Sequence, residues 1–312
     1  MNRARDIDKY LKKYAVSPMR PLLAASVAGV DQAVVIPALA ESSSLFRTLS
    51  CIAANPSGEL RRTLVVCVVN NHRPTVAAEE KIRDNQVTLA ILKELMVGRI
   101  PSAAGPAMLK DDLERIAGSS LRLGCIDASS TDAEIPDRDG GVGTARKIGM
   151  DAALTVLNGG GPGGGVICCL DADTLVMENY FAAVYAHFSI TDDPAAVAGY
   201  AHQKPADPRL LAAICCYEIF LRAYVMGLSF AGSPYAFHAI GSTMSSFVCG
   251  FPLCLSCDRL DDVLYGAGVC GRPGDEPADG RRGFSLPRQA CQAPESRPYW
   301  IDDCFSLFAA LG

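Results

Sequence analysis

The chain contains 312 residues, of which 49% are hydrophobic and 20% are charged. This balance excludes a disordered or fibrous protein and allows one large core or two modest ones, as in globular enzymes. The formal net charge of -5 supplies no broad basic surface, so we expect no nucleic-acid partner, and any phosphate contacts must be local.

The N-terminus and the apolar stretches bear on localisation. The chain begins Met-Asn-Arg-Ala-Arg-Asp-Ile-Asp, which has no apolar signal core, so we expect a cytoplasmic protein whose 13 cysteines are reduced. The longest apolar stretches, 22–40 and 211–239, are interrupted by polar residues: Asp31 and Gln32 in the first, Glu218 and Arg222 in the second. We therefore expect no transmembrane segment, while peripheral membrane contact stays open.

Strands alternate with helices along the first half of the chain. Apolar, β-branched runs predict strands, and apolar residues at helical spacing predict helices. The predicted strands cover 33–38, 64–69, 121–126 and 166–170, and the predicted helices cover 41–54, 84–97 and 145–157. Because most of these strands are apolar throughout, they indicate an α/β fold with a mostly parallel sheet and helices on both faces. Residues 1–32 are expected to form a helical extension.

An acidic pair follows the fourth predicted strand. Ligands of parallel sheets bind beyond the carboxyl ends of the strands, where Asn70, Asn71, Asp127, Asp171 and Asp173 lie. Strand geometry sends the side chains of residues 171 and 173 to the same side. Two converging carboxylates repel each other, and a hard cation such as Mg2+ or Mn2+ relieves that repulsion. An isolated Asp-x-Asp motif is most often a solvated turn. Here the motif directly follows a predicted strand, and this position favours a metal site.

The glycine-rich segment 159–165 is a weaker signal. It precedes a strand, whereas a phosphate-binding loop follows a strand and opens a helix. We interpret it as a flexible connector.

Three segments of the chain resemble family 2 glycosyltransferases. Residues 34–41 are similar to the first strand and nucleotide loop of that family, 141–149 to its Gly-x-Ala-Arg-Asn-x-Gly element, and 169–173 to its metal motif. Their order and spacing agree over roughly residues 33–245. The resemblance implies a GT-A (Rossmann-like) fold, a nucleotide-diphosphate sugar donor, a divalent metal (Mn2+ or Mg2+) and an acceptor of unknown identity.

The resemblance also implies roles for particular residues. Glu41 with Asn70 or Asn71 would face the base and ribose, Arg146 the nucleotide, and Asp171 with Asp173 the metal. The full set of implied nucleotide-binding residues is Pro37, Ala38, Glu41, Asn70, Asn71, Arg146 and Asp171. The chain departs from the family at Ala40, at Asn70 and Asn71, and at Lys147, which leaves the identity of the nucleotide open.

Each of these residues has a simpler explanation. Glu41 can cap the helix that it begins, because acidic residues suit a helix N-terminus. Asn70 and Asn71, shortly before Pro74, suit a turn that needs no ligand. Arg146 can be an ordinary surface residue of its helix, although a cation directly after a glycine turn suits a phosphate.

The second half of the chain contains a predicted helix and a candidate acceptor loop. Residues 213–224 place apolar residues at helical spacing, which we interpret as core packing. Residues 232–243 combine glycines, hydroxyls and one histidine without a clean period, which is typical of a binding loop. The candidate acceptor residues there are Tyr235, His238, Ser242 and Thr243.

The histidine, serine and threonine residues of this half could have either a binding or a structural role. His238 can be a third metal ligand, an acceptor contact or a structural histidine. Ser242 and Thr243 can bind acceptor hydroxyls or simply form turns. His202, which follows a predicted strand, is a weaker candidate.

The tail 246–312 has an atypical composition with crowded cysteines and little periodicity, and we expect it to be irregular. Cys254 and Cys257 have the spacing of half a zinc site, but a second close pair is missing. Family 2 enzymes that invert the anomeric carbon usually use an Asp in a Glu-Asp motif as general base. The expected segment does not appear in this chain, where Asp302-Asp303 is the only acidic pair near the end.

A change of reading frame is our hypothesis for the origin of the tail. Codons for residues 280–290 can be chosen so that the frame one nucleotide later reads Ala-Gly-Glu-Asp-Phe-His-Phe-Leu-Ala-Lys-Leu. That sequence is similar to the surroundings of the family's catalytic base. Our hypothesis is a frameshift between about residues 245 and 268, which leaves the tail out of frame and the chain without its general base.

The sequence thus favours a domain over 33–245 that is a metal-dependent glycosyltransferase of inverting type. One alternative is a nucleotide-sugar-binding remnant that lacks its base. Another is a nucleotidyltransferase, which predicts a glycine-rich loop with Lys or Arg directly after the first strand. Residues 38–44 are not such a loop.

Overall fold

The structure is a computed structural model that describes residues 3–71, 79–101, 109–136, 141–158, 165–191, 195–199, 201–233, 236 and 244–247. The chain divides into two compact units. Within the described residues, one unit contains the sheet and seven helices, and the other contains the long helix α8 (Pro208–Phe230). The predicted domain 33–245 therefore spans both units, and all but two residues of the predicted tail lie outside the described residues.

Seven strands form one mixed sheet in the order β1-β4-β3-β2-β5-β7-β6. They are β1 (Leu22–Ala24), β2 (Gln32–Ala38), β3 (Thr63–Asn70), β4 (Arg122–Ala128), β5 (Val166–Cys169), β6 (Ala195–Val197) and β7 (Met244–Phe247). The four central strands, β4, β3, β2 and β5, are parallel. The three short strands at the two edges pair antiparallel. The prediction of an α/β fold with a mostly parallel sheet is confirmed.

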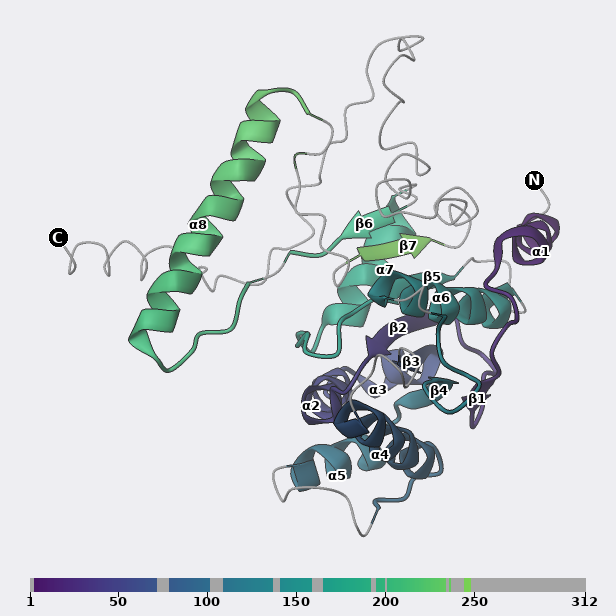
Figure 1. The fold of residues 1–312 in the computed structure, drawn as a ribbon. Coiled ribbons are helices and arrows are strands. Elements are labelled where there is room, and N and C mark those ends of the chain that lie inside the picture. The colour runs from purple at the N-terminus through teal and green to yellow at the C-terminus, as the bar shows by residue number, and fades with distance from the viewer. Residues whose placement is uncertain are drawn as a thin grey trace. The chain divides into compact units, whose positions relative to one another are not determined.

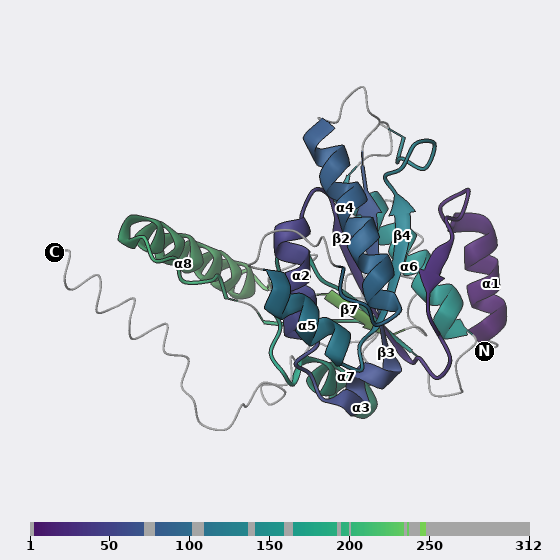
Figure 2. The ribbon, with the colours of Figure 1, turned by 90° about the horizontal axis from the view of Figure 1, so that it is seen from below.

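Helices cover both faces of the sheet (Figure 1, Figure 2). In addition to α8 the described helices are α1 (Arg3–Tyr14), α2 (Ser42–Ile52), α3 (Ser57–Arg62), α4 (Glu79–Met96), α5 (Lys110–Gly118), α6 (Val142–Asn158) and α7 (Tyr180–Ile190). The buried side chains of α2, α4, α5 and α7 belong to the core on one face. Those of α1 and α6 belong to the core on the other face.

The two cores meet in the central strands. Every residue of β2 and of β3 is buried. Alternate residues of β2 serve opposite faces, so that Val34 and Ile36 join the α2 and α4 core while Ala33 and Val35 join the α6 core. Burial of each Val, Leu or Ile side chain stabilises the fold by about 1.5–3 kcal/mol. These buried, mostly apolar strands carry the loops described below.

Gly149 brings α6 close to the sheet. A Cβ at this position would lie 2.8 Å from Cγ2 of Val68 and closer still to Cγ1 of Val35. Side chains do not reach such separations without movement of the backbone, because protein cores are close-packed. A glycine is therefore required where the middle of α6 crosses β2 and β3.

The N-terminal segment contributes a strand as well as a helix. Helix α1 packs on α6, and β1 pairs antiparallel with β4, with Leu22 opposite Ile126. The segment is thus helical as predicted over Arg3–Tyr14, and it also forms one edge of the sheet.

Two predictions from the sequence need correction. The fourth strand ends at Cys169 and not at residue 170, because the chain turns at Asp171. The helix predicted over 213–224 is longer, and within its own unit it shows no core packing beyond the buried side chain of Cys215. By length and composition α8 could cross a membrane, and it meets that test alone among the described helices.

Candidate functional site

The order of the parallel strands in the sheet reverses between β2 and β5. From β2 the chain proceeds to β3 and then β4 on one side, whereas β5 lies on the other side of β2. Such a switch point opens a crevice at the carboxyl ends of the two strands, where ligands of α/β sheets bind. The segment after β2 contains Glu41, and the segment after β5 contains Asp171 and Asp173.

A turn holds Asp171 and Asp173, and α2 holds the turn. The Thr174 amide donates to the carbonyl of Asp171 at 3.1 Å. On the α2 side, the Thr48 hydroxyl donates to the carbonyl of Ala172 at 2.8 Å. Ala172 is buried, whereas Asp171 is half-buried and Asp173 is exposed. The two carboxylates are therefore displayed by a turn anchored to a helix, and not by the strand alternation that the sequence suggested.

Glu41 does not cap α2 with its side chain. It occupies the N-cap position, but its carboxylate makes no capping bond and accepts a hydrogen bond from the Leu39 amide at 3.3 Å. Asp84 of α4 satisfies the helix start instead, accepting from the amide of Ser42 at 3.1 Å and from its hydroxyl at 2.5 Å. Glu41 therefore makes no side-chain capping bond, although it stands at the N-cap position of α2.

Glu41 lies in an electronegative environment. Burial raises the pKa of its carboxyl group above the ordinary value, the hydrogen bond from Leu39 opposes this rise, and the charges of Asp173, Asp171 and Asp84 add to it. These four acidic residues thus interact electrostatically at the switch point. We call Glu41, Asp84, Asp171 and Asp173, together with Arg146, the acidic edge.

Arg146 is the cation of the acidic edge. Its guanidinium forms an ion pair with Asp171, and its side chain is only 15% exposed. The Nε–H group of Arg146 is buried and has no hydrogen-bond partner among the described residues. Gly141, with φ of +126°, precedes α6 and allows the chain to enter the helix at this point. Arg146 is therefore not an ordinary surface residue.

Asn70 and Asn71 lie at the carboxyl end of β3, which neighbours β2. The Asn70 carbonyl accepts from the side-chain amide of Asn85 at 3.0 Å. The main chain of Asn71 is bonded to Ala128 and Ile135. Its side chain is buried, yet neither its amide nitrogen nor its amide oxygen has a partner among the described residues. A buried carboxamide without partners destabilises a fold unless a ligand or water completes it.

Backbone strain marks the loop that joins β2 to α2. Ala40 has a φ of +55°, a left-handed backbone conformation that residues with a Cβ atom rarely adopt. The Ala40 amide donates to the Asn85 side chain at 2.8 Å. Asn85 therefore ties this loop to the end of β3. The sequence analysis did not single out Asp84 or Asn85, although two polar residues early in a helix that follows a strand were a usable signal.

Pro37 and Ala38 form the end of β2 and are buried. A proline is tolerated in this central strand because β5 pairs with β2 only as far as Val35, so no neighbouring strand requires the missing N–H. These two residues are the last of β2 before the loop that contains Ala40 and Glu41.

The predicted acceptor residues Tyr235, His238, Ser242 and Thr243 lie outside the described residues. Among the residues that the structure does describe, no group of three or more His, Cys, Asp or Glu side chains is arranged to hold a metal ion. His202, the weaker candidate, lies in the α8 unit, where its Nδ1 is 2.5 Å from a carboxylate oxygen of Glu218.

A second polar cluster lies away from the acidic edge, between α1 and α6. Buried Asp151 accepts from the Tyr10 hydroxyl at 2.9 Å and from the Val16 amide at 2.8 Å. Lys147 also donates to the Tyr10 hydroxyl, at 2.6 Å. Lys147, one of the departures from the family pattern, thus serves to dock α1.

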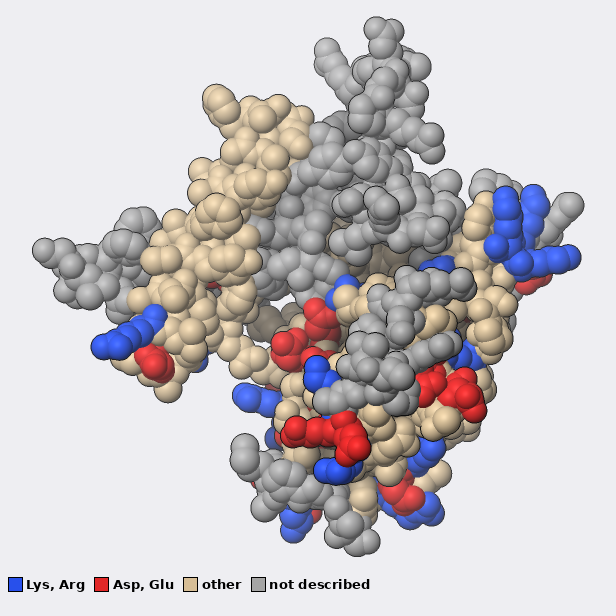
Figure 3. Space-filling view, in the orientation of Figure 1, with Lys and Arg blue, Asp and Glu red and all other residues tan. Residues whose placement is uncertain are grey.

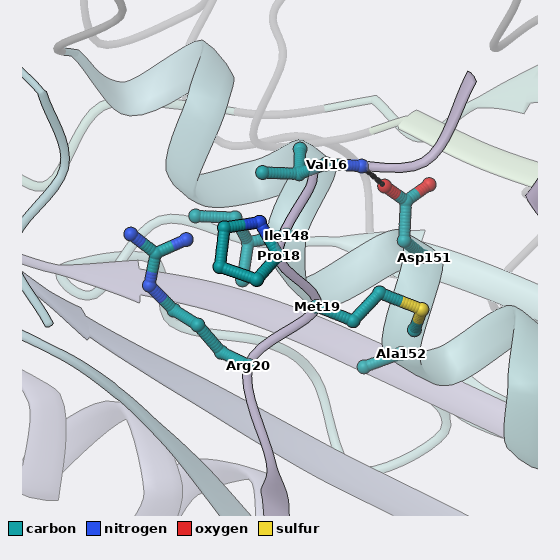
Figure 4. A pocket seen from close by; sticks show the side chains of 7 residues that line it. All are labelled: Val16, Pro18, Met19, Arg20, Ile148, Asp151 and Ala152. Carbon is teal, nitrogen blue, oxygen red and sulfur yellow. Dashed lines mark hydrogen bonds between the residues drawn. The ribbon is translucent and has the colours of Figure 1, made fainter. Parts of the chain in front are cut away.

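Beside this cluster a small pocket opens (Figure 4). It is lined by Val16, Pro18, Met19, Arg20, Ile148, Asp151 and Ala152. Burial raises the pKa of Asp151, although Lys147 and the hydrogen bonds just described oppose that rise. Since the polar groups here are engaged with one another, the pocket is part of the packing of the N-terminal segment.

Comparison with known proteins adds no relative. No protein-family model, no curated protein and no solved structure matches this chain.

Proposed function

We propose that this protein binds a nucleoside-diphosphate sugar together with a divalent cation at the acidic edge, and that it is a metal-dependent glycosyltransferase with a GT-A type fold. The observation that carries the proposal is the meeting of Glu41, Asp171, Asp173 and Arg146 at the switch point of the sheet. The three sequence segments that resemble family 2 glycosyltransferases supply these same residues.

The carboxylates of the acidic edge suit Mg2+ or Mn2+ as these ions are bound in sites that transfer phosphate or sugar groups. Such ions take one or two carboxylates and complete their shell with substrate phosphates and water. Asp171 and Asp173 would hold the ion. Beside them, burial raises the pKa of Glu41, and the charges of Asp173 and Asp171 add to that rise. When bound, the cation neutralises charge that develops on the departing diphosphate.

The neighbouring residues supply the remaining contacts in this proposal. The unpartnered Nε–H of Arg146 is a buried donor suited to a phosphate oxygen. The unpartnered carboxamide of Asn71 offers one acceptor and two donor hydrogens to a base or ribose. Glu41, which is free of the capping role, accepts hydrogen bonds from a ribose hydroxyl or a base N–H.

Calorimetric titration with UDP- and GDP-sugars, with and without Mn2+, tests the proposal. We expect binding that requires Mn2+, and Asp171→Asn or Asp173→Asn should weaken it at least about tenfold, the effect of losing a charge-assisted contact. Asp111→Asn, at an exposed position of α5, is the matched control and should bind like the parent. Absence of binding by the parent chain to any of these sugars would refute the proposal.

A second candidate is donor binding without turnover. It is motivated by the absence of a Glu-Asp motif in frame in the sequence after residue 245. Release of nucleoside diphosphate, measured in the presence of sugar acceptors, separates the two functions. Sequencing of the gene tests the frameshift directly, because an uninterrupted locus without Glu-Asp codons in the shifted frame would disprove it.

A further inference from the structure

Helix α8 presents apolar side chains on two sides. Seven large apolar residues are exposed: Leu210, Tyr217, Ile219, Phe220, Tyr224, Met226 and Phe230, the last of which is 97% exposed. At about 100° per residue, Tyr217, Phe220 and Tyr224 fall within about 60° of one another. Ile219, Met226 and Phe230 fall within about 40° on the other side of the helix.

This distribution distinguishes α8 from an ordinary surface helix. A helix that docks on one protein surface has a single apolar stripe and a polar opposite face. A helix that is apolar on most sides is either a core helix or surrounded by lipid. Within its own unit α8 is not a core helix, since only 6% of its most apolar 18-residue window is buried.

The length of α8 matches the hydrocarbon thickness of a bilayer. Its 23 residues extend over about 35 Å at 1.5 Å per residue, and a bilayer core is about 30 Å thick. The charges in the middle of the helix are paired, because the carboxylate of Glu218 lies 2.9 Å from Arg222. It also lies 2.5 Å from His202, which precedes the helix. Pairing lowers the cost of bringing these groups into lipid.

The surface view agrees with this description. On the face of the molecule that Figure 3 shows, the α8 region is mostly uncharged, and Lys or Arg and Asp or Glu side chains appear near one end. Arg209 and Asp207 stand at the start of the helix. By contrast, charges of both signs are scattered over the unit that contains the sheet.

We propose that α8 inserts into the apolar region of a lipid bilayer and attaches the protein to a membrane. We assign lipid as the partner of the exposed apolar residues of α8, because a bilayer surrounds a helix and covers both of its apolar sides at once. This inference is independent of the donor site, which lies in the other unit.

Flotation of the full-length chain with phosphatidylcholine vesicles tests the inference. We expect the parent to float with the vesicles and to remain bound in high salt, because the attachment is apolar. Phe220→Lys, near the middle of α8, should lower the partition coefficient about a hundredfold, given the cost of a lysine at the centre of a membrane helix. Tyr224→Lys should act in the same direction.

Ile190→Lys is the control, since this α7 residue is 81% exposed and apolar in the other unit. It should float like the parent, and circular dichroism should show that all three variants remain folded. A parent chain that stays in the soluble fraction, or a Phe220→Lys variant that floats fully, would overturn the inference. So would concentration-dependent self-association without flotation, which would identify a second copy of the chain as the occupant of α8.

Discussion

The central strands and the loops at their carboxyl ends follow different rules. In β2 and β3 every residue is buried, and the apolar side chains alternate between two cores. One to three residues further on, Ala40 has a left-handed backbone, Glu41 has a raised pKa and the side chain of Asn71 lacks hydrogen-bond partners among the described residues. Local inconsistencies of this kind concentrate at functional sites, where stability is given up for binding. Changes in packing at the central strands should therefore lower the free energy of unfolding, whereas some substitutions in the loops should raise it.

The largest expected effect is in the scaffold. Gly149→Ala places a methyl group against Val35 and Val68, and overpacking of a core typically costs about 1–3 kcal/mol or more. Urea denaturation should show this loss of unfolding free energy. Gly143→Ala, in the same helix but with no atom near the added Cβ, should be neutral or up to about 1 kcal/mol stabilising. Equal effects at both positions would contradict the close approach of α6.

Two buried asparagines should respond in opposite ways. Asn71→Leu removes an unpartnered carboxamide and should raise the free energy of unfolding by about 1–3 kcal/mol while weakening donor binding. Asn85→Leu leaves the Asn70 carbonyl and the Ala40 amide without their partner. This variant should lower the free energy of unfolding by a similar amount. Thermal unfolding of both variants beside the parent checks the pair. A loss of stability in Asn71→Leu would show that its side chain is satisfied.

The strained loop should tolerate glycine. Ala40→Gly relieves a left-handed conformation that costs roughly 1–2 kcal/mol, against an entropy penalty of about 0.4–1 kcal/mol in the unfolded chain. We expect a net gain of up to about 1 kcal/mol in chemical denaturation. Ala54→Gly, in a turn without a positive φ, carries the entropy penalty alone and should destabilise.

The smallest effect concerns the dependence of stability on pH. Because the pKa of Glu41 is raised in the folded protein, mainly by burial, the folded state holds this proton more tightly than the unfolded chain does. Ionised Glu41 therefore opposes folding above its folded pKa, and this opposition disappears as pH falls below the ordinary value of 4.5. Glu41→Gln should be more stable than the parent near pH 7 and equal to it near pH 4. A constant difference across that range would argue against the electronegative environment.

The framework was predictable from the sequence because its elements are long and strongly patterned. The four parallel strands and the helices α2, α4 and α6 were placed within a few residues, since β-branched runs and helical spacing are local signals. The edge strands β1, β6 and β7 have only three or four residues each, too few for a periodic pattern. The sheet order, which creates the switch point, follows from tertiary packing and not from any local signal.

The candidate site was predictable in part. Asp171 and Asp173 were identified from their position after a strand, and Glu41 and Arg146 from the resemblance to family 2 glycosyltransferases. Asp84 and Asn85 were not, because their role depends on which loop α4 meets in space. The exposure of α8 likewise depends on which elements cover it, so helical spacing alone suggested core packing.

The pairing of β1 with β4 bears on the solubility of the protein. A chain that began after residue 25 would keep the whole acidic edge, yet the outer side of β4 would present unpaired N–H and C=O groups. An uncovered strand edge is a template on which other chains can add, and short antiparallel strands are one natural means of preventing this. The three residues of β1 therefore protect the molecule against intermolecular β-sheet growth, a role separate from any contact with a ligand.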